Sequence, residues 1–131
     1  MKTVTQVAVF GENRPGTLQT IAEGLTSLDV NVLGISVTGA ADHAVIRLVV
    51  DDDHAAAQAF SLNGIDAIFS EIFELQMPLD GKFGLAEISQ DLSDAGVNIQ
   101  YVYGSPIPGG TLFMRVSDPA KGLTVLEGMG L

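Results

Sequence analysis

The sequence contains no cysteine among its 131 residues. A disulfide framework, a thiolate metal site and a cysteine nucleophile are therefore all excluded, and this fits a reducing compartment. Long apolar runs are also missing, because no stretch approaches the ~20 apolar residues that cross a bilayer. Residues 1–10 lack the basic segment and long apolar run of a secretion signal. We therefore expect a cytoplasmic protein.

Positive charge is scarce. Six basic residues stand against sixteen acidic ones, which gives a net charge of -10 at pH 7. This sign opposes binding to phosphate backbones and to anionic lipid surfaces, so we expect neither nucleic acid nor a membrane as a partner. Hydrophobic residues, in contrast, make up 47% of the chain, enough to bury a core. A chain of this length forms one domain or, at most, two small modules.

One pattern occurs twice along the chain. Shifted by 67 positions, the sequence aligns with itself at Leu18 and Leu85, Ile21 and Ile88, Leu25 and Leu92, Val30 and Val97, and Asn31 and Asn98. A repeat of this length indicates a duplicated supersecondary unit. We therefore predict two units, residues 1–70 and 71–131.

The first copy has the pattern of a βαββαβ unit. Weak alternation of β-branched residues predicts strands, and apolar residues spaced three and four apart predict a helix. The predicted elements are a strand at 4–10, a helix at 18–28, hairpin strands at 31–37 and 44–50 with a five-residue connection, a helix from Asp53 to Phe60, and a strand at 67–77. Asp53 is the expected N-cap of the second helix.

The second copy repeats this order but is shorter. Its first strand ends at Met77, and a helix at 85–95, strands at 98–103 and 111–116, and a last helix follow. Asp118 and Pro119 supply an N-cap and a proline at the first helical position. No fourth strand follows in the second copy. We expect another segment to cover this sheet edge, or the edge to remain an association surface.

The turn from Glu12 to Leu18, which joins the first strand to the first helix, is the most informative segment. Such a turn directs unpaired N–H groups and the positive end of the helix dipole at one spot, which favours an anion such as the carboxylate of an amino acid. Gly16 removes a side chain that would block close approach to the backbone. A purely structural alternative is a tight turn at Pro15 and Gly16, with Asn13 or Thr17 as the helix cap.

These segments resemble the signature of the ACT domain family: Asn13-Arg14-Pro15-Gly16-Thr17-Leu18 followed by Val30-Asn31-Val32, and a weaker version at 81–85 and 95–99. The resemblance implies an α+β fold of two tandem ferredoxin-like βαββαβ units, with antiparallel sheets, helices on one face, and the second unit lacking its last strand. It also implies regulatory binding of an amino acid or related small molecule at an interface between units.

Positions that match the motif are the candidate ligand-binding residues. In the first copy they are Glu12, Asn13, Arg14, Pro15, Gly16, Thr17, Leu18, Asn31 and Val32, and in the second they are Gly81, Lys82, Phe83, Gly84, Leu85, Asn98 and Ile99. For Asn31 and Asn98 an ordinary turn asparagine is a competing interpretation. The second turn departs from the pattern, because Lys82 and Phe83 occupy the place of Arg14-Pro15-Gly16. The second copy therefore either binds something different or mainly supports an interface.

Catalytic, metal and cofactor sites are not indicated. His43 and His54 lack a clustered third ligand, and Asp51-Asp52-Asp53 lacks the glycine and later glutamate of a calcium loop. No serine lies in a G-x-S-x-G context. A hydrolase of ferredoxin-like fold would need a cationic cradle, and Arg14 alone offers little of one. We expect no enzyme activity and no cofactor.

Two functions remain. The first is a small-molecule regulatory protein with a ligand, probably an amino acid by chemistry, at the interface between units. The second is a ligand-free regulatory or stabilising subunit of a separate metabolic enzyme. In either case we expect a homodimer or a partner enzyme to associate through a sheet edge.

Overall fold

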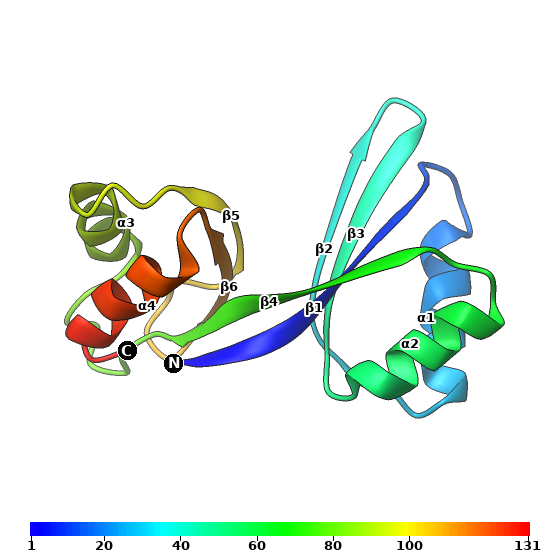
Figure 1. Cartoon of the computed structure of the whole chain (residues 1–131), viewed down its shortest axis with the longest axis horizontal. Helices are drawn as coiled ribbons and strands as arrows, with labels where there is room; N and C mark the ends of the chain where they lie inside the picture. The colour runs from blue at the N-terminus through cyan, green and yellow to red at the C-terminus, as the bar shows by residue number, and fades with distance from the viewer. The chain divides into compact units, whose positions relative to one another are not determined.

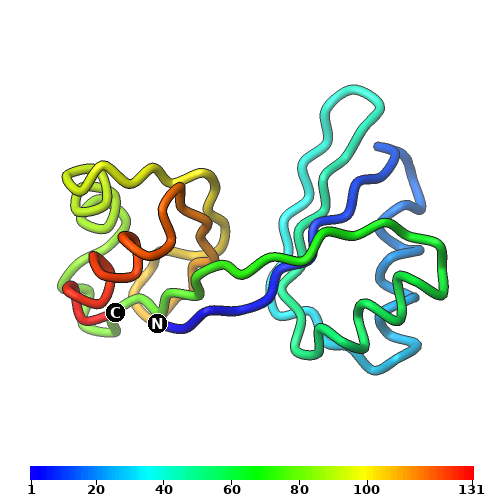
Figure 2. Tube along the Cα trace, in the orientation of Figure 1, coloured from blue at the N-terminus to red at the C-terminus, as the bar shows by residue number.

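A computed structural model describes all 131 residues, and residue contacts divide them into two units (Figures 1 and 2). The N-terminal unit comprises Thr5–Glu71. The C-terminal unit comprises Ile72–Leu131 together with Met1–Val4. The expected ranges 1–70 and 71–131 assign the first four residues to the other unit. Both chain ends therefore belong to the C-terminal unit, as Figure 2 shows.

The N-terminal unit has the predicted βαββαβ order. Its elements are β1 (Lys2–Glu12), α1 (Thr17–Ser27), β2 (Val32–Ala40), β3 (His43–Val50), α2 (Asp53–Leu62) and β4 (Ala67–Gln76). Hydrogen-bonded neighbours follow the order β2-β3-β1-β4, with β3 antiparallel to both β1 and β2. Strands β1 and β4 continue into the C-terminal unit.

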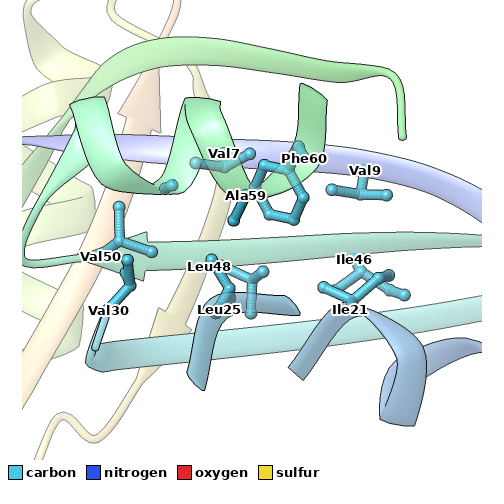
Figure 3. Packing of buried hydrophobic residues seen from close by; sticks show 11 residues of the cluster. Val7, Val9, Ile21, Leu25, Val30, Ile46, Leu48, Val50, Ala59 and Phe60 are labelled. Carbon is cyan, nitrogen blue, oxygen red and sulfur yellow. The ribbon is translucent and has the colours of Figure 1, made fainter. Parts of the chain in front are cut away.

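Both helices of this unit pack against one face of its sheet. Alternate residues of β1 and β3 point towards α1 and α2, whose apolar residues recur at helical spacing. The resulting core, shown in Figure 3, consists of Val7, Val9, Ile21, Leu25, Val30, Ile46, Leu48, Val50, Ala56, Ala59 and Phe60. This core fixes the start of α1 against the end of β1, which is where the candidate turn lies.

The C-terminal unit is the second copy. It contains α3 (Leu85–Asp94), β5 (Ile99–Gly104), β6 (Thr111–Val116) and α4 (Pro119–Gly128), and its strands follow the order β1-β4-β6-β5. Both units thus have a ferredoxin-like strand order. A β-bulge occurs between Val32 and Gly34 in β2 and, 67 positions later, between Ile99 and Tyr101 in β5. Equivalent irregularities at equivalent positions support the duplication.

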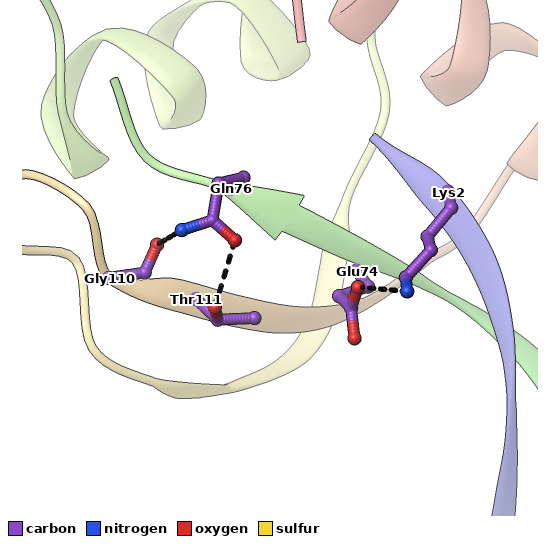
Figure 4. Close-up of polar contacts among 5 residues, drawn as sticks. All are labelled: Lys2, Glu74, Gln76, Gly110 and Thr111. Carbon is purple, nitrogen blue, oxygen red and sulfur yellow. Dashed lines mark hydrogen bonds and ion pairs between the residues drawn. The ribbon is translucent and has the colours of Figure 1, made fainter. Parts of the chain in front are cut away.

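The fourth strand of the C-terminal unit comes from the start of the chain. Residues 2–4 of β1 lie beside β4, and Lys2 Nζ pairs with Glu74 Oε2 at 3.1 Å (Figure 4). On the other side of β4, Gln76 donates to the Gly109 carbonyl at 2.7 Å. Met1 packs against the core of this unit. The sheet edge that the sequence left open is therefore covered by the protein's own first residues.

Two local predictions were wrong. The N-cap of α2 is Asp52, whose side chain accepts from the Ala55 N–H at 3.0 Å, and Asp53 is the first helical residue. The β2–β3 connection has two residues instead of five, and Ala41 takes a φ of 54° there. Sequence propensity located both turns but not their end residues. Asp118 caps α4 as predicted.

Candidate functional site

The β1–α1 turn leaves backbone N–H groups open. Gly16, the residue before α1, has a φ of 93°, a left-handed conformation that glycine adopts without strain, and no side chain caps the helix. The amides of Gly16, Leu18 and Gln19 make no hydrogen bond within the protein. The alternative in which Asn13 or Thr17 caps the helix is therefore wrong. These donors and the helix dipole favour an anion at this point.

Hydroxyl groups hold the turn in this shape. Thr17 Oγ1 donates to the Glu12 carbonyl at 2.7 Å, and Thr20 Oγ1 donates to the Gly16 carbonyl at 3.0 Å. Both bonds use carbonyl oxygens and consume none of the open N–H groups. The turn is thus fixed through its acceptors while its donors stay available.

Asn13 connects the turn to the tip of the β2–β3 hairpin. Its backbone N–H donates to the Asp42 carbonyl at 2.9 Å, and its Nδ2 donates to the Ala41 carbonyl at 3.0 Å. The side chain lies so close to Gly39 that a Cβ there would meet Asn13 Nδ2 at 2.9 Å. Within the unit, Asn13 is therefore a structural link between the turn and the hairpin.

A groove of about 340 Å³ opens beside the turn. It is lined by β1, α1 and the α2–β4 connection, through Val9, Phe10, Gly11, Glu12, Arg14, Thr17, Thr20, Ile21, Gly64, Ile65 and Asp66. Arg14 Nε pairs with Glu12 Oε2 at 2.9 Å, and both side chains are exposed. The groove thus combines an ion pair, two hydroxyls, a further carboxylate and an apolar floor.

Several lining residues were not among the sequence candidates. Phe10 is adjacent to the motif, Thr20 lies one turn into α1, and Ile65 and Asp66 come from a connection far along the chain. The only signal near the last two is Gly64, which takes a φ of 63° after α2. Such a glycine predicts a helix end and gives no indication of the groove that the connection joins.

Asn31 and Val32 lie at the opposite end of α1 from the turn. The helix has 11 residues, or roughly 16 Å at about 1.5 Å per residue. Asn31 donates through its N–H and its Nδ2 to the two carboxylate oxygens of Asp51, at 2.9 and 2.8 Å. These two bonds, the side-chain one first, lower the pKa of Asp51 below its ordinary value. One site that contains both the turn and Asn31 requires a second unit.

The equivalent turn of the second copy is closed by its own carboxylate. Glu87 Oε2 accepts from the Gly84 N–H at 2.8 Å, and this bond lowers the pKa of Glu87. Asp80 Oδ1 accepts from the Lys82 N–H at 3.1 Å, and Lys82 Nζ lies 5.6 Å from the centre of the Phe83 ring. An acidic side chain thus already occupies the spot that an anion would take.

The remaining candidates of the second copy lie elsewhere in the C-terminal unit. Leu85 begins α3 next to the closed turn, and Gly81 has a φ of 67° within it. Asn98 and Ile99 line a separate hollow of about 390 Å³ near the C-terminal end of α3. The Asn98 backbone exchanges hydrogen bonds with Ser117 at 2.9 and 2.8 Å, so it holds strand β5 in place as Asn31 holds β2.

Metal and membrane sites are not found in the structure. No group of three or more His, Asp or Glu side chains is arranged to hold a metal ion. His43 Nε2 instead lies 3.3 Å from Asp42 Oδ1 at the hairpin tip. No helix has the length and apolar character needed to cross a membrane.

The comparisons with known proteins agree with this architecture. The family model for the ACT domain pair matches residues 2–127, so the chain belongs to the ACT domain family, in the class that carries two such domains. A search of curated protein sequences gave no match. The resemblance inferred from the two motifs is confirmed.

Solved structures resemble the chain over nearly its whole length. Protein BT0572 of Bacteroides thetaiotaomicron is 25% identical, covers 98% of this chain with 89% of its own, and superposes with a TM-score of 0.88. The regulatory subunit of aspartate kinase from Thermus thermophilus is 16% identical, with coverages of 94% and 90% and a TM-score of 0.67. A C-terminal regulatory domain of aspartate kinase from Porphyromonas gingivalis is 14% identical, with coverages of 97% and 91% and a TM-score of 0.63. The last two show a shared fold.

Proposed function

We propose that this protein is a non-enzymatic regulatory protein that binds an amino acid at the start of α1. The observation that carries the proposal is the set of open amides at Gly16, Leu18 and Gln19 beside a groove of about 340 Å³. A ligand carboxylate accepts from these amides, and the rest of the ligand lies in the groove. The names of two similar structures, both regulatory parts of aspartate kinase, support a regulatory role.

One chain offers one such site. Glu87 closes the corresponding position of the second copy, because its carboxylate accepts from the Gly84 N–H. The C-terminal unit then stabilises the protein without binding the same ligand. A stoichiometry of one amino acid per chain follows from this difference between the two turns.

Association with a second copy completes the site and provides the regulatory output. Strand β2 is the last strand of the order and exposes Leu33, Ile35 and Val37 by 53%, 47% and 50%. An exposed apolar edge strand is a template for pairing with another chain, here a homodimer partner. A ligand that binds between two units stabilises the arrangement that forms the site, so occupancy shifts the population of assembled protein.

A ligand-free subunit of a separate metabolic enzyme is the second candidate. Its original support, the open edge of the second copy, is weakened because residues 2–4 cover that edge. The β2 edge keeps this candidate in consideration, since it can pair with another protein as well as with a second copy. Light scattering on the purified chain discriminates, because a dimer without a partner favours the first function.

Thermal denaturation with each of the twenty amino acids tests the proposal, followed by titration calorimetry on those that respond. A ligand at 100 times its Kd adds about 2.7 kcal/mol of stability, which raises Tm by several degrees. We expect at least one amino acid to do so, with one molecule bound per chain. The absence of a response to all twenty would contradict the proposed function.

A further inference from the structure

One carboxylate of the groove has no partner in the protein. Asp66 lines the groove from the connection between α2 and β4, and its side chain makes no hydrogen bond or ion pair. Glu12, the other acidic residue of the lining, is paired with Arg14 at 2.9 Å. The groove therefore carries one uncompensated negative charge, close to the turn that offers open amides.

This arrangement distinguishes ligands by charge. The open amides at the start of α1 favour a carboxylate, whereas the Asp66 carboxylate favours a cation. An amino acid with a neutral or basic side chain satisfies both. An acidic amino acid brings a second carboxylate into a groove that already contains Asp66, in a chain with a net charge of -10. Repulsion between charges ~5 Å apart in a solvent-exposed groove weakens binding by about tenfold.

The remaining lining fits the same class of ligand. Phe10 is exposed by 62% and Ile65 is half-buried beside Asp66, so both offer apolar contact to an aliphatic stem. The Thr17 and Thr20 hydroxyls already donate to backbone carbonyls. Arg14 is engaged with Glu12 and is the only basic residue of the lining. No free cation is thus present to receive a side-chain carboxylate.

We propose that Asp66 determines ligand specificity: its carboxylate binds the ammonium group of a neutral or basic amino acid and excludes aspartate and glutamate. The inference rests on the proposed function, because it concerns the same groove. It adds the charge class of the ligand and a residue, outside the sequence motif, that selects it.

Titration calorimetry on the full chain tests this, with wild type, Asp66→Asn and Asp29→Asn. Asp29 is the matched control, because it is exposed, lies at the far end of α1, and removes the same charge from the chain. Its φ of 56° is a conformation that asparagine also accepts. The ligands are the twenty amino acids, with glutamine and glutamate, and asparagine and aspartate, as pairs that differ in charge and little in shape.

We expect every amino acid that binds the wild type to be neutral or basic. Asp66→Asn should weaken the tightest of them about tenfold and reduce the preference for each amide over its acid, whereas Asp29→Asn should change neither. Tight binding of glutamate or aspartate to the wild type, or an Asp66→Asn variant that binds as the wild type does, overturns the inference and leaves the proposed function standing. A wild type that binds none of the twenty overturns the proposed function itself.

Discussion

Replacing Gly16 by leucine separates the two consequences of that glycine, backbone conformation and access to the amides. At a φ of 93° a residue with a Cβ is strained by about 1–2 kcal/mol. A Cβ at this position meets no heavy atom within 4 Å, so steric overlap adds nothing. For a chain of this size the strain lowers Tm by roughly 3–8 °C. The fold should survive the substitution.

The effect on binding should be larger than this strain. A leucine side chain beside the open amides prevents a carboxylate from approaching them, and a hydrogen bond to a charged group contributes about 1.5–3 kcal/mol. Affinity for the amino acid should therefore fall roughly 10- to 150-fold. Calorimetry well below the Tm of the variant measures this loss without interference from unfolding.

Gly96→Leu provides the matched control. Gly96 has a φ of 74°, its Cβ position is equally open, and it follows α3 in the C-terminal unit. Its substitution carries a similar strain but lies away from the groove. We expect a comparable loss of Tm with unchanged affinity. If both leucine variants bind the amino acid equally well, the reasoning about the amides near Gly16 is refuted.

Three further predictions follow from other contacts. Because hydrogen bonding from Gly84 lowers the pKa of Glu87, the stability that its carboxylate contributes is present above the ordinary value of about 4.5 and is lost as pH falls. Glu87→Gln should thus lower Tm at pH 7, with a difference that narrows below about pH 4.5; a constant difference speaks against it. Asn13→Ala should lose two hydrogen bonds to the hairpin tip and speed amide exchange at residues 38–43, while unchanged exchange would contradict the link. Ile35→Lys should convert a dimer into a monomer in light scattering without changing the circular dichroism spectrum, and a persistent dimer would exclude the β2 edge as the interface.

The duplicated fold was predictable because its signals are local. Leu25 and Leu92 hold equivalent places on two helices, and both are fully buried. Their spacing to the other apolar residues depends only on helical geometry. The start of the chain was less readable, since Lys2 and Thr3 carry no apolar alternation. Their role as the fourth strand of the other unit depends on which edge is free, and that is a property of the assembled fold.

The candidate site was predictable in part for the same reason. The open amides near Gly16 follow from the order strand, turn, helix, which the sequence contains in one short segment. Asp66 reaches the groove only because α2 returns the chain to that end of the unit. The bonding of Glu87 to Gly84 and of Asn13 to the hairpin tip depends on side-chain conformations that spacing does not specify.

A titration of the labelled chain with its tightest-binding amino acid, followed by ¹⁵N–¹H NMR, tests the central claim most directly. The account predicts that the largest shifts occur at the backbone amides of Gly16, Leu18, Gln19 and Asp66, and that the amide of Gly84, already bonded to Glu87, does not respond. Saturable binding that leaves residues 16–19 unperturbed would contradict it.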